Sequence, residues 1–265
     1  MKTPWGTRPG EDVRKLLWYA ASRERHAELR RKLRHRLDHL AERVTRVPAR
    51  AQCWCVDVAV APRDAVRRLA GTELTSFSEG HPALWQAARA RVEARPVGLG
   101  GGASVDVLYA LVRALRPRRV LETGVANGWS ALAILTALDE NGEGALVSTD
   151  LPGVVGAEAL VGRAVGTEGH PRWTLLRRGD REALPEALRL LGGVDLFHYD
   201  SDKSTEGRLA ACRVVWPALA EGGLLLSDDI NDNFGFRDFC REVARAPLVF
   251  RGDDEGTKYV GAIVK

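Results

Sequence analysis

Acidic residues directly follow two apolar runs in the second half of this 265-residue sequence. The run Val194–Tyr199 leads into Asp200, and the run Gly223–Ser227 leads into Asp228 and Asp229. Short apolar runs bounded by turn residues are typical of buried strands, and ligands of open α/β sheets lie beyond the carboxyl ends of such strands. Clustered carboxylates repel one another unless a cation holds them, and oxygen ligands suit Mg²⁺ or Ca²⁺. The spacing therefore predicts a divalent-cation site.

A glycine-containing turn, Glu122–Ser130, follows an earlier strand pattern. Gly124 permits a tight turn, and Gly128 permits the close approach of a ligand to the backbone. The turn lacks the G-x-G-x-x-G spacing of a dinucleotide site, and the acid that precedes it disfavours phosphates but suits an ammonium or sulfonium group. Asp150 follows the next strand, where a carboxylate commonly binds ribose hydroxyls. Together these residues indicate a cofactor site for a cationic group and a ribose.

The E-x-G-x-x-x-G-x-S run of this turn, followed by Asp150, resembles the cofactor motifs of class I S-adenosylmethionine-dependent methyltransferases over roughly residues 100–265. The resemblance implies that Glu122 and Gly124 face the methionine end of the cofactor and that Asp150 binds its ribose. It also implies that Gly179 and Asp180 lie beside the adenine. The cofactor-binding residues that we expect are Glu122, Gly124, Asn127, Gly128, Ser130, Asp150, Gly179, Asp180 and Asp200.

The segment Phe197–Lys203, with the later Asp228-Asp229 pair, is similar to metal-dependent O-methyltransferases. These include the catechol and caffeoyl-CoA enzymes and the bacterial sugar and antibiotic O-methyltransferases related to macrocin O-methyltransferase. The resemblance implies that Asp200, Asp228 and Asp229 bind Mg²⁺ or another divalent cation. A cation on an alcohol oxygen lowers the pKa of the alcohol and fixes the oxygen in line with the sulfonium methyl group.

Two residues are candidates for the base that removes the hydroxyl proton, and the sequence leaves the choice open. Lys203 requires a depressed pKa, which neighbouring carboxylates oppose, whereas Asp202 is a weak base that needs no adjustment. His198 alternates with Phe197 along the strand and is expected to be a packed residue. The resemblance implies methyl transfer to a hydroxyl of a small sugar, polyketide or phenolic acceptor, as in bacterial specialised metabolism and antibiotic biosynthesis.

Two alternative functions remain at this point. Residues 1–50 carry 14 Lys and Arg against 6 Asp and Glu, so an RNA methyltransferase could use basic N-terminal helices to bind its substrate. A non-catalytic cofactor-binding accessory protein is the other alternative. However, no N/D-P-P-Y/F tetrapeptide stands at Asp200, and the C-terminal region lacks an aromatic and basic patch for stacking nucleotides. Both absences favour a small hydroxylated acceptor over nucleic acid.

Strand and helix patterns alternate after residue 99, and this alternation and the resemblance together predict the fold. We expect residues 99–265 to form the class I methyltransferase domain, a Rossmann-like, doubly wound α/β fold. Its seven-stranded sheet is mostly parallel and ends in a C-terminal antiparallel hairpin. Residues 1–98 are expected to be a helical extension that covers the acceptor site or builds a homodimer, with a helix over 11–47 that ends at Pro48. No apolar run is long enough to span a membrane, and residues 1–6 lack a signal-peptide core, so we expect a cytoplasmic protein.

Overall fold

The structure is a computed structural model that describes residues 47–265, except residues 95–98, 100–103, 152–157, 167–168 and 254–255. Before residue 47 it describes only residues 17, 19–21, 26 and 29–30. Apart from these positions, the helix predicted over 11–47 lies outside the described residues. Residue 98, at which the helical extension is expected to end, also lies outside them.

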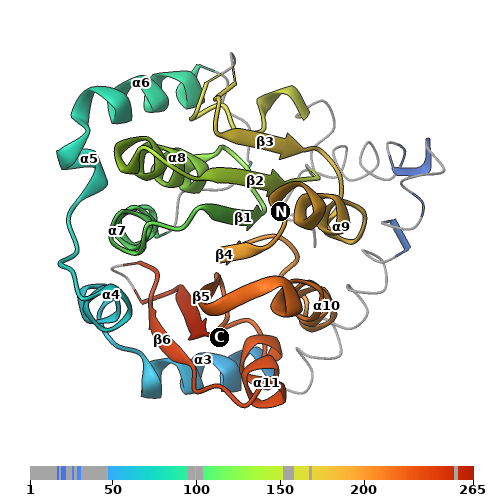
Figure 1. The fold of residues 1–265 in the computed structure, drawn as a ribbon. Coiled ribbons are helices and arrows are strands. Elements are labelled where there is room, and N and C mark those ends of the chain that lie inside the picture. The colour runs from blue at the N-terminus through green and yellow to red at the C-terminus, as the bar shows by residue number, and fades with distance from the viewer. Residues whose placement is uncertain are drawn as a thin grey trace, which may run out of the picture.

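A seven-stranded sheet forms the centre of the described chain, in the order β3-β2-β1-β4-β5-β7-β6 (Figure 1). Strands β1 to β5 are parallel to one another, and β7 runs antiparallel to both of its neighbours, β5 and β6. This sheet confirms the predicted Rossmann-like fold with a C-terminal antiparallel hairpin. The strands are β1 (Arg119–Thr123), β2 (Ala145–Thr149), β3 (Trp173–Leu176), β4 (Val194–Tyr199), β5 (Leu219–Ser227), β6 (Leu248–Arg251) and β7 (Tyr259–Val264).

Helices cover both faces of this sheet (Figure 1). Side chains from α4, α7 and α8 share one apolar core with the strands, and side chains from α3, α9, α10 and α11 share the other. The helices are α3 (Val47–Val58), α4 (Pro62–Ala70), α5 (Phe77–Gly80), α6 (Pro82–Glu93), α7 (Val105–Leu115), α8 (Trp129–Asn141), α9 (Asp180–Leu191), α10 (Thr205–Val215) and α11 (Gly235–Glu242), with 3-10 turns η2 (Glu158–Leu160) and η3 (Trp216–Ala218).

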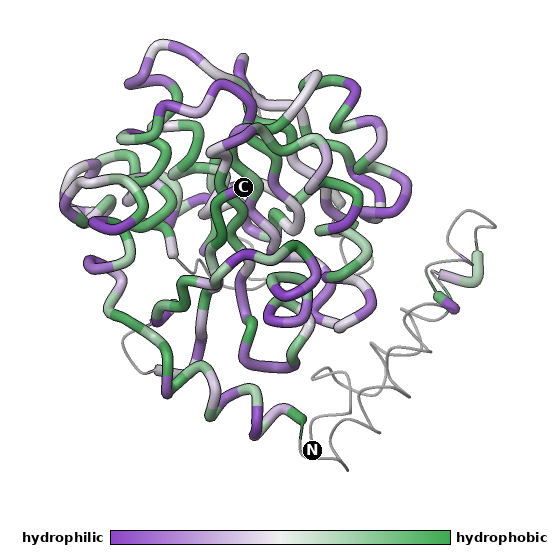
Figure 2. The backbone as a smooth tube through the Cα atoms, turned by 60° about the horizontal axis from the view of Figure 1, so that its bottom comes forward, coloured by the Kyte–Doolittle hydropathy of each residue, from purple (hydrophilic) through white to green (hydrophobic). Residues whose placement is uncertain are grey.

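The central strands are apolar on both faces because both faces are covered by helices. Along β4, Leu196 packs into the core of α7 and α8, while its neighbour Phe197 packs into the core of α9 and α10. Both side chains are at most 1% exposed, and burying each of them contributes about 1.5–3 kcal/mol. Hydrophobic residues accordingly gather along the middle of the molecule in Figure 2. The rigid sheet that results fixes the positions of the loops at its carboxyl edge.

The described part of the N-terminal region packs directly on this sheet. Between α3 and α4, the amide of Val60 donates to the carbonyl of Val249 at 2.9 Å, which pairs this segment with the edge strand β6. Such pairing covers an edge that would otherwise present free backbone groups. Pro48 does not end a helix but is the second residue of α3, where a missing amide hydrogen breaks no intrahelical bond. None of the described helices is long and apolar enough to span a membrane.

Candidate active site

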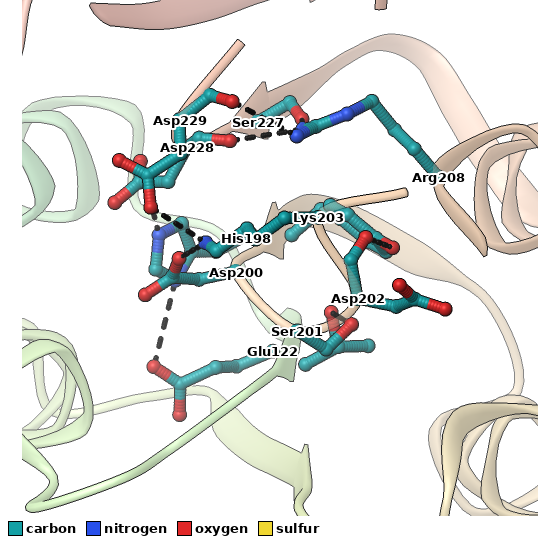
Figure 3. Close-up of polar contacts among 12 residues, drawn as sticks. Glu122, His198, Asp200, Ser201, Asp202, Lys203, Arg208, Ser227, Asp228 and Asp229 are labelled. Atoms are coloured by element: carbon teal, nitrogen blue, oxygen red, sulfur yellow. Dashed lines mark hydrogen bonds and ion pairs between the residues drawn. The ribbon is translucent and has the colours of Figure 1, made fainter. Parts of the chain in front are cut away.

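The carboxyl ends of β1, β4 and β5 lie side by side and carry the predicted acidic residues (Figure 3). In the sheet, Thr123 of β1 pairs with Tyr199 of β4, which pairs with Ser227 of β5. The amide of Asp200 donates to the carbonyl of Thr123 at 2.8 Å, and the amide of Asp228 donates to that of Tyr199 at 2.9 Å. Asp200 and Asp228 therefore leave the same edge of the sheet from adjacent strands.

Lys203 lies between two of these carboxylates. Its Nζ is 3.0 Å from Oδ2 of Asp229 and also forms an ion pair with Oδ1 of Asp200. Burial disfavours the ammonium, but the charges of Asp200 and Asp229 outweigh this effect and raise the pKa of Lys203. Burial and the charge of Asp228 raise the pKa of Asp200 to about 6, against the opposing effect of Lys203. Lys203 is thus the cation that neutralises this cluster, and it is protonated at neutral pH in this arrangement.

A chain of buried charged groups crosses the sheet beneath the cluster (Figure 3). On β4, His198 has its Nδ1 3.5 Å from Oε1 of Glu122 and its Nε2 3.6 Å from Oδ1 of Asp228. Burial disfavours the imidazolium, but the two carboxylates outweigh this effect and raise the pKa of His198 to about 10. Burial raises the pKa of Asp228, but the pairing with His198 prevails and holds it below its usual range. His198 is therefore a packed residue, as expected, that also links Glu122 to Asp228 as a buried cation.

Glu122 lies inside the sheet, where its side chain is fully buried. Its Oε2 accepts a hydrogen bond from Ser148 Oγ at 2.7 Å, and that hydroxyl accepts one from Trp173 Nε1 at 2.9 Å. Polar contacts thus run from β3 through β2, β1 and β4 to Asp228 at the end of β5. These contacts occupy the Glu122 carboxylate within the protein, and the contact with the methionine end of a cofactor stays a prediction.

The glycine turn is held by Asp150 and by close contacts with the protein's own backbone. Oδ2 of Asp150 accepts hydrogen bonds from the amides of Val125 and Ala126, each at 2.7 Å. A methyl group on Gly124 would overlap the carbonyl of Asp200, and one on Gly128 would lie 2.7 Å from Cα of Gly162. Gly128 therefore permits the close approach of the protein's own backbone at Gly162. Its contact with a cofactor stays a prediction.

Replacing Gly124 with alanine should destabilise the protein by about 3 kcal/mol. The residue has φ of 80°, which disfavours an L side chain, and the added methyl group meets the Asp200 backbone. Gly142 is a matched control, because its φ is 75° but nothing lies within 4 Å of an added methyl group. Gly142→Ala should cost about 1 kcal/mol, which is the strain of the left-handed backbone alone. Urea denaturation measures both, and equal losses would contradict the contact with Asp200.

A segment after β2 packs over the glycine turn. The amides of Gly162 and Ala164 donate to the carbonyls of Ala126 and Asn127 at 2.9 and 2.8 Å. The side-chain oxygen of Asn127 accepts a hydrogen bond from Arg163 Nε at 3.0 Å, and Asn127 is only 5% exposed. From α6, Arg91 donates to the carbonyls of residues 163 and 164, which ties the N-terminal helices to this turn. Ser130 is buried in the first turn of α8 and its side chain does not cap the helix.

Asp180 and Asp202 lie on the α9 and α10 side of the site. Asp180 accepts hydrogen bonds from Thr149 Oγ1, at 2.9 Å, and from Ser201 Oγ, so it joins the ends of β2 and β4. Gly179 is the N-cap of α9. The carboxylate of Asp202 accepts a hydrogen bond from the amide of Ser204 at 3.0 Å and points away from Asp228 and Asp229 (Figure 3). A cavity of about 260 Å³ between α9 and α10 is lined by both aspartates and by Arg181, Leu184, Pro185, Gly207, Ala210, Ala211 and Val214.

The predicted metal ligands have suitable chemistry for a hard divalent cation. Asp200 and Asp229 already share one cation, the Lys203 ammonium, and Oδ1 of Asp228 accepts no hydrogen bond. Carboxylate oxygens are the usual ligands of Mg²⁺. Within the described residues, no three His, Cys, Asp or Glu side chains are arranged to hold a metal ion. The donor set fits such an ion once Lys203 moves from between Asp200 and Asp229.

The sequence patterns missed one residue of this site. Arg208 of α10 is fully buried and donates to the carbonyls of Asp228 and Asp229 at 2.9 and 3.1 Å. It lies in the first half of α10, whose sequence has an ordinary amphipathic pattern. Nothing in that local sequence indicates a contact with β5. Only the packing of α10 beside the end of β5 reveals the contact.

The sequence of residues 121–230 matches a family described as a methyltransferase domain. This range begins within β1 and includes both the glycine turn and the Asp228-Asp229 pair. No curated protein matches the sequence at a significant level.

Solved structures of methyltransferases have a fold similar to that of this chain. An O-methyltransferase from Bacillus cereus in complex with SAH is 16% identical and has a TM-score of 0.53, with 76% of this chain and 97% of that chain covered. The O-methyltransferase TomG from Streptomyces achromogenes, involved in tomaymycin synthesis and in complex with SAM, is 19% identical with a TM-score of 0.52, at 77% and 96% coverage. The SAH-bound methyltransferase PaMTH1 from Podospora anserina is 17% identical with a TM-score of 0.50, at 85% and 94% coverage.

Proposed function

We propose that this protein is an S-adenosylmethionine-dependent, Mg²⁺-dependent O-methyltransferase that acts on a hydroxyl group of a small molecule. The observation that carries the proposal is the cluster of Asp200, Asp228, Asp229 and Lys203 at the carboxyl edge of the sheet, beside the glycine turn of a methyltransferase domain. The O-methyltransferases of similar fold that bind SAH or SAM add support.

The glycine turn would hold the cofactor, with Asp150 binding its ribose and with Glu122 and Gly124 facing its methionine end. Asn127, Gly128 and Ser130 shape the turn, and Asp200 closes it from the β4 side. Gly179 and Asp180 would lie beside the adenine, and Asp180 also lines the cavity between α9 and α10. The cofactor supplies the electrophilic methyl group, and the protein's part is to orient that group toward the acceptor oxygen.

Asp200, Asp228 and Asp229 hold the divalent cation. When bound, such a cation lowers the pKa of the acceptor hydroxyl and fixes its oxygen. His198 keeps the Asp228 carboxylate charged and directed, because the buried imidazolium pairs with it. The four carboxylates of Glu122, Asp200, Asp228 and Asp229 exceed the nearby cations in number, which favours an added positive charge at this site.

Lys203 is the base that removes the hydroxyl proton. Its pKa is raised because Asp200 and Asp229 face its ammonium group. Once another cation neutralises these two carboxylates, burial remains as the main effect and lowers the pKa of the lysine. Asp202 is less suited to this role, because its carboxylate binds the amide of Ser204 and points toward α10.

Chelation is the direct test of the metal dependence. We expect EDTA to reduce methyl transfer to a hydroxylated acceptor to background, and added Mg²⁺ to restore it, because the acceptor hydroxyl is a poor nucleophile without a cation. Turnover is followed as S-adenosylhomocysteine formation over a panel of sugar, polyketide and phenolic acceptors. Full activity in EDTA would remove the metal from the proposal. A wild-type protein that binds no S-adenosylhomocysteine in calorimetry would remove the proposal as a whole.

The proposed activity also suggests the metabolic context, the cellular location and the assembly of the protein. We place the reaction in bacterial specialised metabolism, such as antibiotic biosynthesis, in the cytoplasm, with the N-terminal region covering the acceptor. A homodimer is the assembly that we propose, and light scattering after size-exclusion chromatography measures it. RNA is not proposed as the substrate, because the acidic cluster at the site repels a phosphate backbone.

A further inference from the structure

Arg208 is a fully buried cation at the edge of the candidate site (Figure 3). Its guanidinium group donates to Ser227 Oγ and to the carbonyls of Asp228 and Asp229, at 2.9 and 3.1 Å for the carbonyls. It also lies over the Tyr199 ring, with its central carbon 5.2 Å from the ring centre. In the part of the chain that the structure describes, it forms no ion pair with a carboxylate side chain. Burying a charge without such a partner costs folding free energy, which suggests that the contacts of Arg208 serve a purpose other than stability.

The backbone that Arg208 binds is in an unfavourable conformation. Asp229 has φ of 51°, in the left-handed region that L residues rarely adopt. In an extended strand, neighbouring side chains point to opposite faces. Here the two neighbouring carboxylates reach one cluster, with Asp228 3.6 Å from His198 and Asp229 3.0 Å from Lys203. The two carbonyl bonds from Arg208 hold the turn that makes this possible.

We propose that Arg208 is a positioning residue of the active site. By binding two successive carbonyls, it fixes the turn at Asp229 and thereby sets the directions of the Asp228 and Asp229 carboxylates. The inference rests on the proposed function, because the same two carboxylates are assigned there to the divalent cation.

Two substitutions separate this role from a merely structural one. Arg208→Met keeps much of the volume but removes the charge and both carbonyl bonds, and Arg208→Lys keeps the charge but loses the planar fork that reaches two acceptors. Lys265→Met is a matched control. Lys265 binds the carbonyls of Trp216, Pro217 and Leu219, at 2.9, 3.2 and 2.8 Å, near the opposite end of β5.

The measurements are Mn²⁺ affinity by electron paramagnetic resonance, S-adenosylhomocysteine affinity by calorimetry, and thermal unfolding. We expect Arg208→Met to weaken Mn²⁺ binding roughly 10- to 100-fold, as loss of groups that orient metal ligands does, with a smaller loss in Arg208→Lys. S-Adenosylhomocysteine affinity should stay within about twofold in both variants, because the glycine turn lies on other strands. Lys265→Met should bind both ligands like the wild-type protein.

Each other outcome overturns the inference in a recognisable way. If the wild-type protein binds Mn²⁺ and Arg208→Met binds it equally well, Arg208 does not position the carboxylates, and the proposed function stands. If both affinities fall together, Arg208 has only a structural role. If Arg208→Met does not fold, the Mn²⁺ affinity of Arg208→Lys decides between these results. If the wild-type protein binds no Mn²⁺, the proposed metal site fails and this inference fails with it.

Discussion

Asp200→Asn should reduce the turnover number on the order of 10³-fold while leaving S-adenosylhomocysteine binding nearly intact. The substitution preserves the shape of the side chain but removes the charge that would hold a divalent cation. Loss of such a Lewis acid costs several kcal/mol of transition-state stabilisation, and each 1.36 kcal/mol is about tenfold in rate. The side chain is 31% exposed, so the change should leave the fold in place. Single-turnover rates and calorimetry measure the two effects separately.

A control for this substitution comes from the loop after β5. Asp232 is exposed, and Asp232→Asn removes the same charge from the same region of the chain but outside the cluster. Its turnover should stay within about threefold of the wild-type value, because exposed charges contribute little and are screened. Equal losses in Asp200→Asn and Asp232→Asn would indicate a general electrostatic effect, and the assignment of Asp200 as a metal ligand would then be wrong.

Lys203→Met should lower turnover about 10²- to 10⁴-fold, the range that loss of a general base produces. Mn²⁺ binding should be retained or become tighter, because the ammonium that pairs with Asp200 and Asp229 is then absent. Because the neutral amine is the base, wild-type turnover should increase with pH as Lys203 loses its proton, at a lower pH with the divalent cation bound than the raised pKa without it implies. The variant should lose this increase. Turnover across a pH series and Mn²⁺ titration together measure the effect.

Asp202→Asn is the matched comparison for Lys203, since both residues are in the same loop and both are candidates for the base. Its carboxylate binds the amide of Ser204 and packs against Gly207 at the start of α10. We therefore expect a loss in turnover below about tenfold, with a small loss in stability from the helix start. A large loss in Asp202→Asn together with an active Lys203→Met would reverse the assignment of the base.

The order of the elements could be predicted because each one has a local signal. Apolar runs such as Leu224 to Leu226 mark buried strands, and the residues after them mark the turns at the carboxyl edge of a sheet. The alternation with helices implies parallel neighbours, since parallel strands require a crossover. Asp200 and Asp228 could therefore be placed together from the order of the residues alone.

The directions of the side chains could not be predicted, because they depend on strand order, register and helix packing. Glu122 is buried against His198 only because β1 and β4 are neighbours and these two residues pair in register. Lys203 turns toward Asp229, whereas Asp202, one residue earlier, turns toward α10.

The sequence by itself thus determined which chemical groups stand at the carboxyl edge of the sheet, because strand and turn signals are local. The tertiary structure alone decided which of them meet. Position 124 must be glycine because the Asp200 backbone leaves no room for a side chain. Asp228 pairs with the buried His198, and Arg208 of α10 binds the backbone at the end of β5. These contacts join residues that are close in space but distant along the chain, and a local pattern carries no information about such distances.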